Sequence, residues 1–188
     1  MKGKESHRLI KKMTIWFTGM PSAGKSTVSK KLSKYLNDID IPNIVLDGDE
    51  IRPIIADGVD YSNSGRMQTI PKYLKLCQII FNSNIIPIVA VNQHTQSSRE
   101  ASRNFFPVGE FCEVWIDTPL EICMKRDVKG LFDKAKRGIV KNLVGHSLEY
   151  ETPKSYDVRI STIDDTVEES AKKIIKFLYD NNNIKAIR

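Results

Sequence analysis

The sequence predicts an α/β fold, in which a parallel five-stranded sheet is covered by helices on both faces. Short apolar runs rich in Ile and Val alternate along the chain with segments of helical periodicity. The predicted strands are 14–18, 43–47, 85–91, 112–117 and 157–161. The predicted helices lie between them, at 25–37, 71–83, 98–106, 119–126 and 166–180.

Each predicted element has its own local signal. The first strand is the apolar run 15–17, and the helix after it carries Val28 and Leu32 on one side with lysines on the other. Pro71 predicts the start of the second helix, because proline is tolerated in a first turn and disrupts a helix later. The last helix has one apolar stripe, formed by Val167, Ala171, Ile174, Ile175 and Leu178.

Length and charge indicate one domain, 13–188, preceded by a basic arm, 1–12. The arm carries five basic residues and one acid, and so supplies +4 of the net charge of +6. We expect a disordered tail there, with nucleic-acid binding as the less favoured alternative. The Asn-rich end, "DNNNIKAIR", is expected to fray.

Composition also bears on cellular location. No apolar run approaches the ~20 residues of a membrane span, and the basic arm lacks the apolar segment of a secretion signal. Cys77, Cys112 and Cys123 are odd in number and widely spaced, which is typical of reduced thiols. We therefore expect a cytoplasmic protein without a membrane or nucleic-acid partner.

The stretch "GMPSAGKST", residues 19–27, matches the phosphate-binding motif G-x-x-x-x-G-K-[ST]. A strand precedes it and a helix follows, so backbone N–H groups and the helix N-terminus face one anion. Lys25 is expected to reach the β- and γ-phosphates, and the Ser26 hydroxyl to bind Mg²⁺. ATP and Mg²⁺ are therefore the predicted cofactors, held through Gly19, Ser22, Ala23, Gly24, Lys25, Ser26 and Thr27.

A pair of acids follows the second strand in "LDGDEIR". Asp47 and Asp49 flank Gly48 at the carboxyl end of the sheet, where ligands of such folds bind. One carboxylate could hold Mg²⁺, for which Asp47 is the candidate, and the other could accept a proton from an attacking hydroxyl. Arg52, one helical turn on, could hold a phosphate or a sulfate. The structural alternative is an Asp-Gly turn with a capping Asp.

Four segments in their order along the chain resemble the adenylylsulfate kinases: "IWFTG…GKST", "LDGDEIR", "EVWIDTPLEICMKRDVKGLFDKAKRG" and "KNLVG". The resemblance covers roughly residues 14–160. It implies a P-loop nucleoside-kinase-like fold with a mobile lid at about 127–146. It also implies transfer of the ATP γ-phosphate to the ribose 3′-hydroxyl of a nucleotide, by a protein that forms a homodimer.

The resemblance assigns roles only where residues match. It favours Asp49 over Asp47 as the general base and leaves the choice between them open. It also implies that Lys25 and Asp47 are catalytic, and that Arg126 packs near the ATP base. It places the acceptor nucleotide among residues of several segments: Asp49, Arg52, Tyr61, Arg66, Gln93, His94, Gln96, Lys141, Asn142 and Leu143.

The chain departs from the family pattern around the acceptor. The family's Ser-Pro-Phe/Tyr-Arg is here Gln93-His94-Thr95-Gln96, and its Asn-Ile-Arg-Arg is here Thr69-Ile70-Pro71-Lys72. Tyr61 and Leu143 align with two phenylalanines that sandwich adenine in the family. One stacking face is thus lost, which weakens a purine more than a pyrimidine.

These departures favour, by a slim margin, a divergent branch that phosphorylates cytidine diphosphoramidate for capsule biosynthesis. The alternative is adenylylsulfate, with 3′-phosphoadenylylsulfate as the product. A non-catalytic regulatory protein is less favoured, since Lys25, Asp47 and Asp49 are all present. A GTPase is not supported, because the sequence has no Asn-Lys-x-Asp motif.

Overall fold

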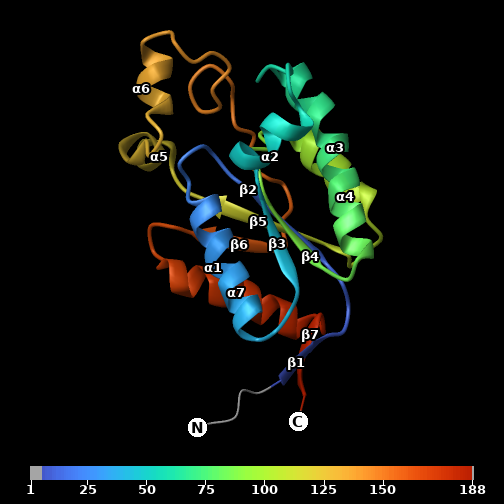
Figure 1. The fold of residues 1–188 in the computed structure, drawn as a ribbon. Coiled ribbons are helices and arrows are strands. Elements are labelled where there is room, and N and C mark those ends of the chain that lie inside the picture. The colour runs from blue at the N-terminus through green and yellow to red at the C-terminus, as the bar shows by residue number, and fades with distance from the viewer. Residues whose placement is uncertain (1–5, 188) are drawn as a thin grey trace.

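A computed structural model describes residues 6–187 of the chain (Figure 1). Its central layer is a parallel sheet in the spatial order β3-β4-β2-β5-β6, with β2 (Thr14–Thr18) in the middle. The other strands are β3 (Asn43–Asp47), β4 (Ile86–Ala90), β5 (Phe111–Asp117) and β6 (Val158–Ser161). The predicted five-stranded sheet is confirmed, and each strand ends within one residue of its predicted position.

Helices cover both faces of this sheet (Figure 1). α1 (Lys25–Asp38) and α7 (Val167–Asp180) pack together on one face, and α3 (Asn63–Asn82) and α4 (Gln96–Phe105) lie on the other. The side chains of β2 alternate between two cores, with Ile15 and Phe17 in one and Trp16 in the other. Every residue of β2 and β4 is buried, as expected for strands that are covered on both sides.

The predicted start of α3 at Pro71 is wrong, because the helix begins at Asn63. The Ser62 hydroxyl caps it, with its Oγ accepting a hydrogen bond from the Gly65 N–H at 3.1 Å. Pro71 lies inside the helix on its exposed side. The opposite side of the helix is buried, and this burial outweighs the hydrogen bond that proline removes. The buried residues are Ile70, Tyr73, Leu74, Cys77 and Phe81.

Further elements were not predicted: β1 (Ser6–Leu9), α2 (Gly48–Ile55), α6 (Leu131–Lys136) and β7 (Ile184–Ile187). β1 pairs antiparallel with β7, and the Asn183 carbonyl accepts hydrogen bonds from the N–H groups of Ile10 and Lys11. The expected disorder of the arm is therefore wrong for β1, and the expected fraying is wrong for β7. Residues 1–5 of that arm lie outside the described residues.

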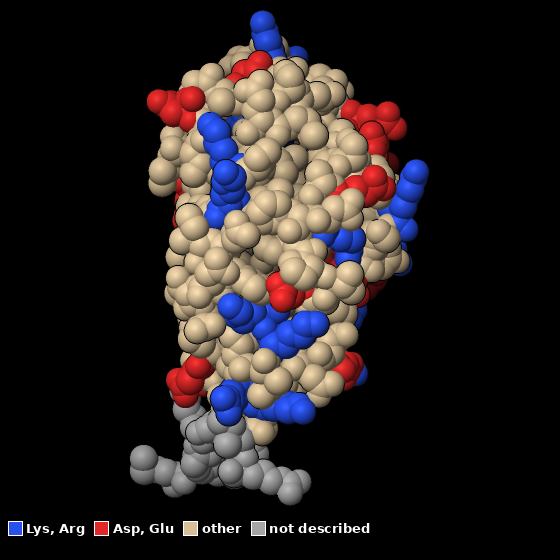
Figure 2. Space-filling model, turned by 90° about the vertical axis from the view of Figure 1, so that its right-hand side faces the viewer, with Lys and Arg blue, Asp and Glu red and all other residues tan. Residues whose placement is uncertain are grey.

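The carboxyl ends of the parallel strands meet at one end of the sheet, beside α2, α5 (Leu120–Arg126) and α6 (Figure 1). On the side covered by α3 and α4, basic and acidic side chains are interspersed, and no continuous basic surface forms (Figure 2). Within residues 6–187, no helix is long and apolar enough to cross a membrane.

Candidate active site

The loop between β2 and α1 has the backbone geometry of a phosphate-binding loop. Gly19 has φ 150°, and a Cβ there would lie 2.7 Å from the Ile116 carbonyl oxygen, so only glycine fits. Gly24 has φ 112° and precedes the first residue of α1. Ser22 also has a positive φ, of 60°. The loop therefore meets the helix N-terminus in a tight turn, as an anion site requires.

Lys25 folds back over this loop. Its Nζ donates hydrogen bonds to the carbonyl oxygens of Gly19 and Met20 at 2.9 and 2.7 Å. Burial lowers the pKa of Lys25 to about 8, although the nearby Cys123 and Asp47 raise it. Phosphate oxygens would stabilise the charged ammonium further, so this lysine is suited to a polyphosphate.

The two predicted acids occupy different environments. Asp47 is buried, and its Oδ1 accepts a hydrogen bond from the Asp49 N–H at 3.0 Å, which caps α2. The Asp49 side chain is 62% exposed and forms an ion pair with Lys129. The sequence predicted no role for Lys129 beyond its place in the lid. The signal that could have singled it out is its position before Gly130, in a segment expected to close over phosphates.

Ser26 and Asp47 are the residues that could hold Mg²⁺. Both offer hard oxygen atoms, and Asp47 lies close enough to Lys25 for their charges to interact. Residues 6–187 contain no cluster of three or more His, Cys, Asp or Glu side chains that could hold a metal. A magnesium ion that takes most of its ligands from ATP and water fits this limited protein donor set.

A cavity of about 340 Å³ lies between α2, α3 and the β4–α4 loop. Its lining contains six of the predicted acceptor residues: Asp49, Arg52, Tyr61, Arg66, Gln93 and His94. The structure therefore brings together the candidate base and both predicted arginines around one space.

The two arginines converge on Tyr61. The Arg52 guanidinium carbon lies 4.2 Å from the centroid of the Tyr61 ring, and that of Arg66 lies 5.4 Å away. Burial and the charge of Arg52 lower the pKa of Arg66 to about 10. Two guanidinium groups that are this close favour an anion between them or beside them.

His94 is held neutral in the cavity wall. Its Nε2 shares a hydrogen bond of 2.8 Å with the Asn63 Oδ1, and its side chain is buried. Burial, with the charges of Arg66 and Arg99, lowers the pKa of His94 to about 4. Gln93 is also buried, and its Nε2 donates to the Ser98 carbonyl and the Ser102 hydroxyl.

The other predicted acceptor residues do not line the cavity. Leu143 is 5% exposed and belongs to the core cluster that includes Cys123 and Phe132, so its side chain offers no stacking face here. The Asn142 carbonyl accepts a hydrogen bond from Arg66 at 3.3 Å and is therefore near the cavity, whereas Lys141 is exposed.

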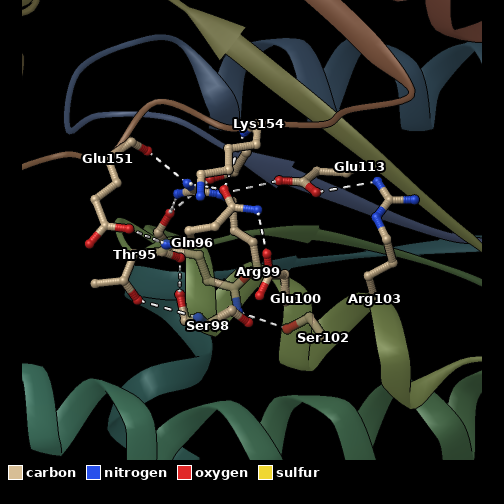
Figure 3. A network of polar contacts seen from close by, with 12 residues as sticks. Thr95, Gln96, Ser98, Arg99, Glu100, Ser102, Arg103, Glu113, Glu151 and Lys154 are labelled. Carbon is tan, nitrogen blue, oxygen red and sulfur yellow. Dashed lines mark hydrogen bonds and ion pairs between the residues drawn. The ribbon is translucent and has the colours of Figure 1, made fainter.

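Gln96 is turned into a polar network centred on Arg99 (Figure 3). Arg99 is 2% exposed and donates to the Gln93 carbonyl, the Gln96 Oε1 and the Glu151 carbonyl at 3.0, 3.0 and 2.7 Å. Its Nε lies 3.7 Å from the buried Glu113 carboxylate. Arg99 was missed from the sequence, because nothing local distinguishes it from a surface arginine on a helix.

Arg126 contacts the phosphate-binding loop from behind. Its Nη1 donates to the Ala23 carbonyl at 3.2 Å and to the Thr162 hydroxyl at 2.8 Å. Arg126 was expected near the ATP base; its hydrogen bonds place it next to the loop that would hold the phosphates.

These positions define a class of protein. Asp49 borders the acceptor cavity, and Asp47, two residues before it, lies within electrostatic reach of Lys25 in the phosphate-binding loop. A phosphoryl group on the loop can therefore meet a hydroxyl group bound in the cavity, as in a P-loop kinase that acts on small molecules.

The chain belongs to the adenylylsulfate kinase family. The family model described as "Adenylylsulphate kinase" matches residues 11–161. The adenylyl-sulfate kinase of Marinobacter nauticus is 34% identical over 183 residues, which cover 97% of this chain and 92% of that protein. The one of Halothermothrix orenii is 34% identical over 174 residues, 93% of each chain.

The structure also matches a solved member of the family. The Mycobacterium tuberculosis APS kinase in complex with AMPPNP and APS superposes with a TM-score of 0.86 at 29% identity, covering 90% of this chain and 98% of that one. The protein is therefore an ATP- and Mg²⁺-dependent phosphotransferase with a hydroxyl acceptor, and the predicted P-loop kinase fold is confirmed.

Proposed function

We propose that the protein transfers the γ-phosphate of ATP to the ribose 3′-hydroxyl of adenylylsulfate. The observation that carries this proposal is the cavity in which Asp49 lies with Arg52 and Arg66. A hydroxyl acceptor needs a base, and a nucleotide with anionic groups needs cations beside it. The proteins that share 34% identity over almost the whole chain carry the name adenylyl-sulfate kinase.

Each group of site residues has its own role in this reaction. The loop 19–24 and Lys25 bind the polyphosphate, and Ser26 with Asp47 would hold the Mg²⁺ that neutralises its charge. Asp49 accepts the proton of the attacking hydroxyl. Arg52 and Arg66 bind the anionic groups of the acceptor and keep its ribose near Asp49.

A second candidate acceptor is a cytidine diphosphate derivative such as cytidine diphosphoramidate. Of the aromatic side chains along the cavity, Tyr61 is 51% exposed, whereas Trp16 and Tyr73 are buried. A base would therefore stack on Tyr61 alone, and each stacked aromatic face contributes ~1–3 kcal/mol. A single stacking face favours a smaller base than adenine.

A substrate panel separates these candidates. The protein would be assayed with ATP, Mg²⁺ and either adenylylsulfate, CDP or cytidine diphosphoramidate, and 3′-phosphorylated products would be identified by mass spectrometry. A higher kcat/KM for adenylylsulfate supports the first proposal, and a higher value for a cytidine compound replaces it with the second. ATP binding without phosphorylation of any acceptor would leave a non-catalytic regulatory protein.

We further propose a cytoplasmic homodimer. The family resemblance supports the dimer, and the three cysteines, which are free and buried, suit a reducing compartment. Light scattering after size exclusion gives the mass in solution, and a monomeric mass would contradict the dimer.

A further inference from the structure

Polar groups from distant segments converge on one carbonyl of the phosphate-binding loop. The Ala23 oxygen lies 3.0 Å from the Thr118 Oγ1, 3.2 Å from the Thr162 Oγ1 and 3.2 Å from the Arg126 Nη1. Thr118 follows β5, and Thr162 follows β6. Ala23 itself is buried, so water does not compete for its carbonyl.

Donor chemistry restricts the proton positions in this cluster. A guanidinium group only donates, so the Thr162 Oγ1 accepts from the Arg126 Nη1 at 2.8 Å. The two threonine hydroxyls are 2.6 Å apart, a separation that requires a proton between them. We assign the shared proton to Thr162, so that Thr118 donates to the shorter contact with the Ala23 carbonyl and each hydroxyl both donates and accepts. Chains of this kind strengthen each of their bonds.

Fixing this carbonyl fixes the next N–H. The peptide between Ala23 and Gly24 is planar and trans, so the Gly24 N–H points opposite to the Ala23 carbonyl, away from Thr162 and Arg126. Gly24 has φ 112° and precedes α1 directly, where loop N–H groups bind phosphate. The Thr162 Cγ2 also lies 3.5 Å from the place where a Gly24 Cβ would be.

We propose that Thr162 is a positioning residue for nucleotide binding, and that it acts through Thr118 and the Ala23 carbonyl to orient the Gly24 N–H toward the nucleotide phosphates. Thr162 touches no reacting atom in this scheme. Thr162 connects the β6–α7 loop to the phosphate-binding loop. It also holds the Arg126 guanidinium against both loops, because the Arg126 Nη2 donates a hydrogen bond to the Thr162 carbonyl at 2.8 Å.

The test compares Thr162→Val, which keeps the shape and removes the hydroxyl, with Thr162→Ser, which keeps the hydroxyl. ADP affinity in the presence of Mg²⁺ would be measured by titration calorimetry. We expect Thr162→Val to weaken ADP binding about tenfold, the effect of one lost buried hydrogen bond, and Thr162→Ser to remain within about twofold of the unmodified protein. Wild-type affinity in a folded Thr162→Val variant overturns the proposal, as does an equal loss in both variants.

A second pair of variants tests the same series of hydrogen bonds at its other hydroxyl, that of Thr118. Thr118→Val should weaken ADP binding to a similar extent, and the losses in Thr118→Val/Thr162→Val should not add, because the two hydroxyls act in one chain. Additive losses of ADP affinity would overturn the proposal that Thr162 acts through Thr118. Thermal unfolding without nucleotide checks that each variant is folded, and Thr118→Val tests the proposal if Thr162→Val is not.

ADP binding involves no acceptor, so this result is independent of the acceptor proposal. Absence of ADP binding by the unmodified protein would contradict the kinase function itself, whereas normal binding by Thr162→Val would contradict only the role of Thr162.

Discussion

Gln96 and Arg99 lie one turn apart on α4, and the Arg99 Nη2 donates a hydrogen bond to the Gln96 Oε1 at 3.0 Å (Figure 3). The same oxygen accepts from the Lys154 N–H at 3.2 Å. The Gln96 side chain therefore links α4 to the segment around Lys154, although the family pattern suggested that this position faces the acceptor. The Gln96 Oε1 thus satisfies one of the donors of the buried Arg99 guanidinium.

Gln96→Arg should destabilise the protein, because it removes this acceptor and adds a like charge beside Arg99. We expect the free energy of unfolding, measured with urea, to fall by ~2 kcal/mol. Gln96→Met is the matched control, since it loses the acceptor and adds no charge, and it should cost less. Equal losses in the two variants would show that the new charge escapes to solvent.

Nucleotide binding should take up a proton above about pH 8. The pKa of Lys25 is lowered to about 8 by burial, and nearby phosphates favour its charged form, so binding raises this pKa. Because the complex then holds more protons than the free protein, ADP affinity should fall as pH rises past 8. Calorimetry in buffers of different ionisation enthalpy measures the uptake. It should be absent in Lys25→Met, and the same uptake there would assign the proton to another group.

Asp49→Asn should lower turnover by at least ~10²-fold while ADP affinity is retained, because the amide cannot accept the hydroxyl proton. Steady-state kinetics with the preferred acceptor, together with calorimetry, separate the two effects. Lys129→Gln removes the ion-pair partner and keeps the base, so it should lower turnover far less than Asp49→Asn does. Near-normal turnover in Asp49→Asn would rule out Asp49 as the base.

The lid, 127–146, should exchange amide hydrogens faster in the free protein than with both nucleotides bound. Its attachments to the acceptor side include the ion pair of Lys129 with Asp49 and the hydrogen bond from Arg66 to the Asn142 carbonyl. Ligands that meet these same residues should hold the segment closed. Hydrogen exchange read by mass spectrometry tests this, and equal protection in the two states would contradict it.

Leu143→Phe should lower stability rather than rebuild an adenine sandwich. Leu143 is 5% exposed within the core cluster that includes Phe132 and Cys123, so a larger ring overpacks it. We expect a loss of ~1–3 kcal/mol in the free energy of unfolding, against less than about 1.5 kcal/mol for the volume-conserving Leu143→Met. A gain in adenylylsulfate affinity at unchanged stability would instead place this side chain at the acceptor.

Local patterns predicted the sheet and the helix after the phosphate-binding loop, because their apolar residues follow the period of each element. The start of α3 escaped prediction, since a proline signal was overridden by burial of Ile70 and Leu74. The pairing of β1 with β7 joins backbone groups from opposite ends of the chain, so neither segment carries a local sequence pattern that predicts it.

Within the site, residue identity located the motif and the acids, and also Arg52 and Arg66 on the cavity. The direction of a side chain could not be read in the same way. Gln96 turns away from the acceptor because Arg99 and the Lys154 N–H bind it, and both partners come into reach only in the folded chain.

The central place of β2 has a consequence for synthesis on the ribosome. β2 pairs with β4 and β5, through Ile15↔Ile88 and Thr14↔Phe111, so the first strand of the sheet to emerge cannot be flanked until most of the chain has followed. The glycine-rich turn after it therefore leaves the ribosome early with no framework around it. Its contact with Thr162 forms later still, so we expect ATP to stabilise the nearly finished chain more than the nascent amino-terminal half.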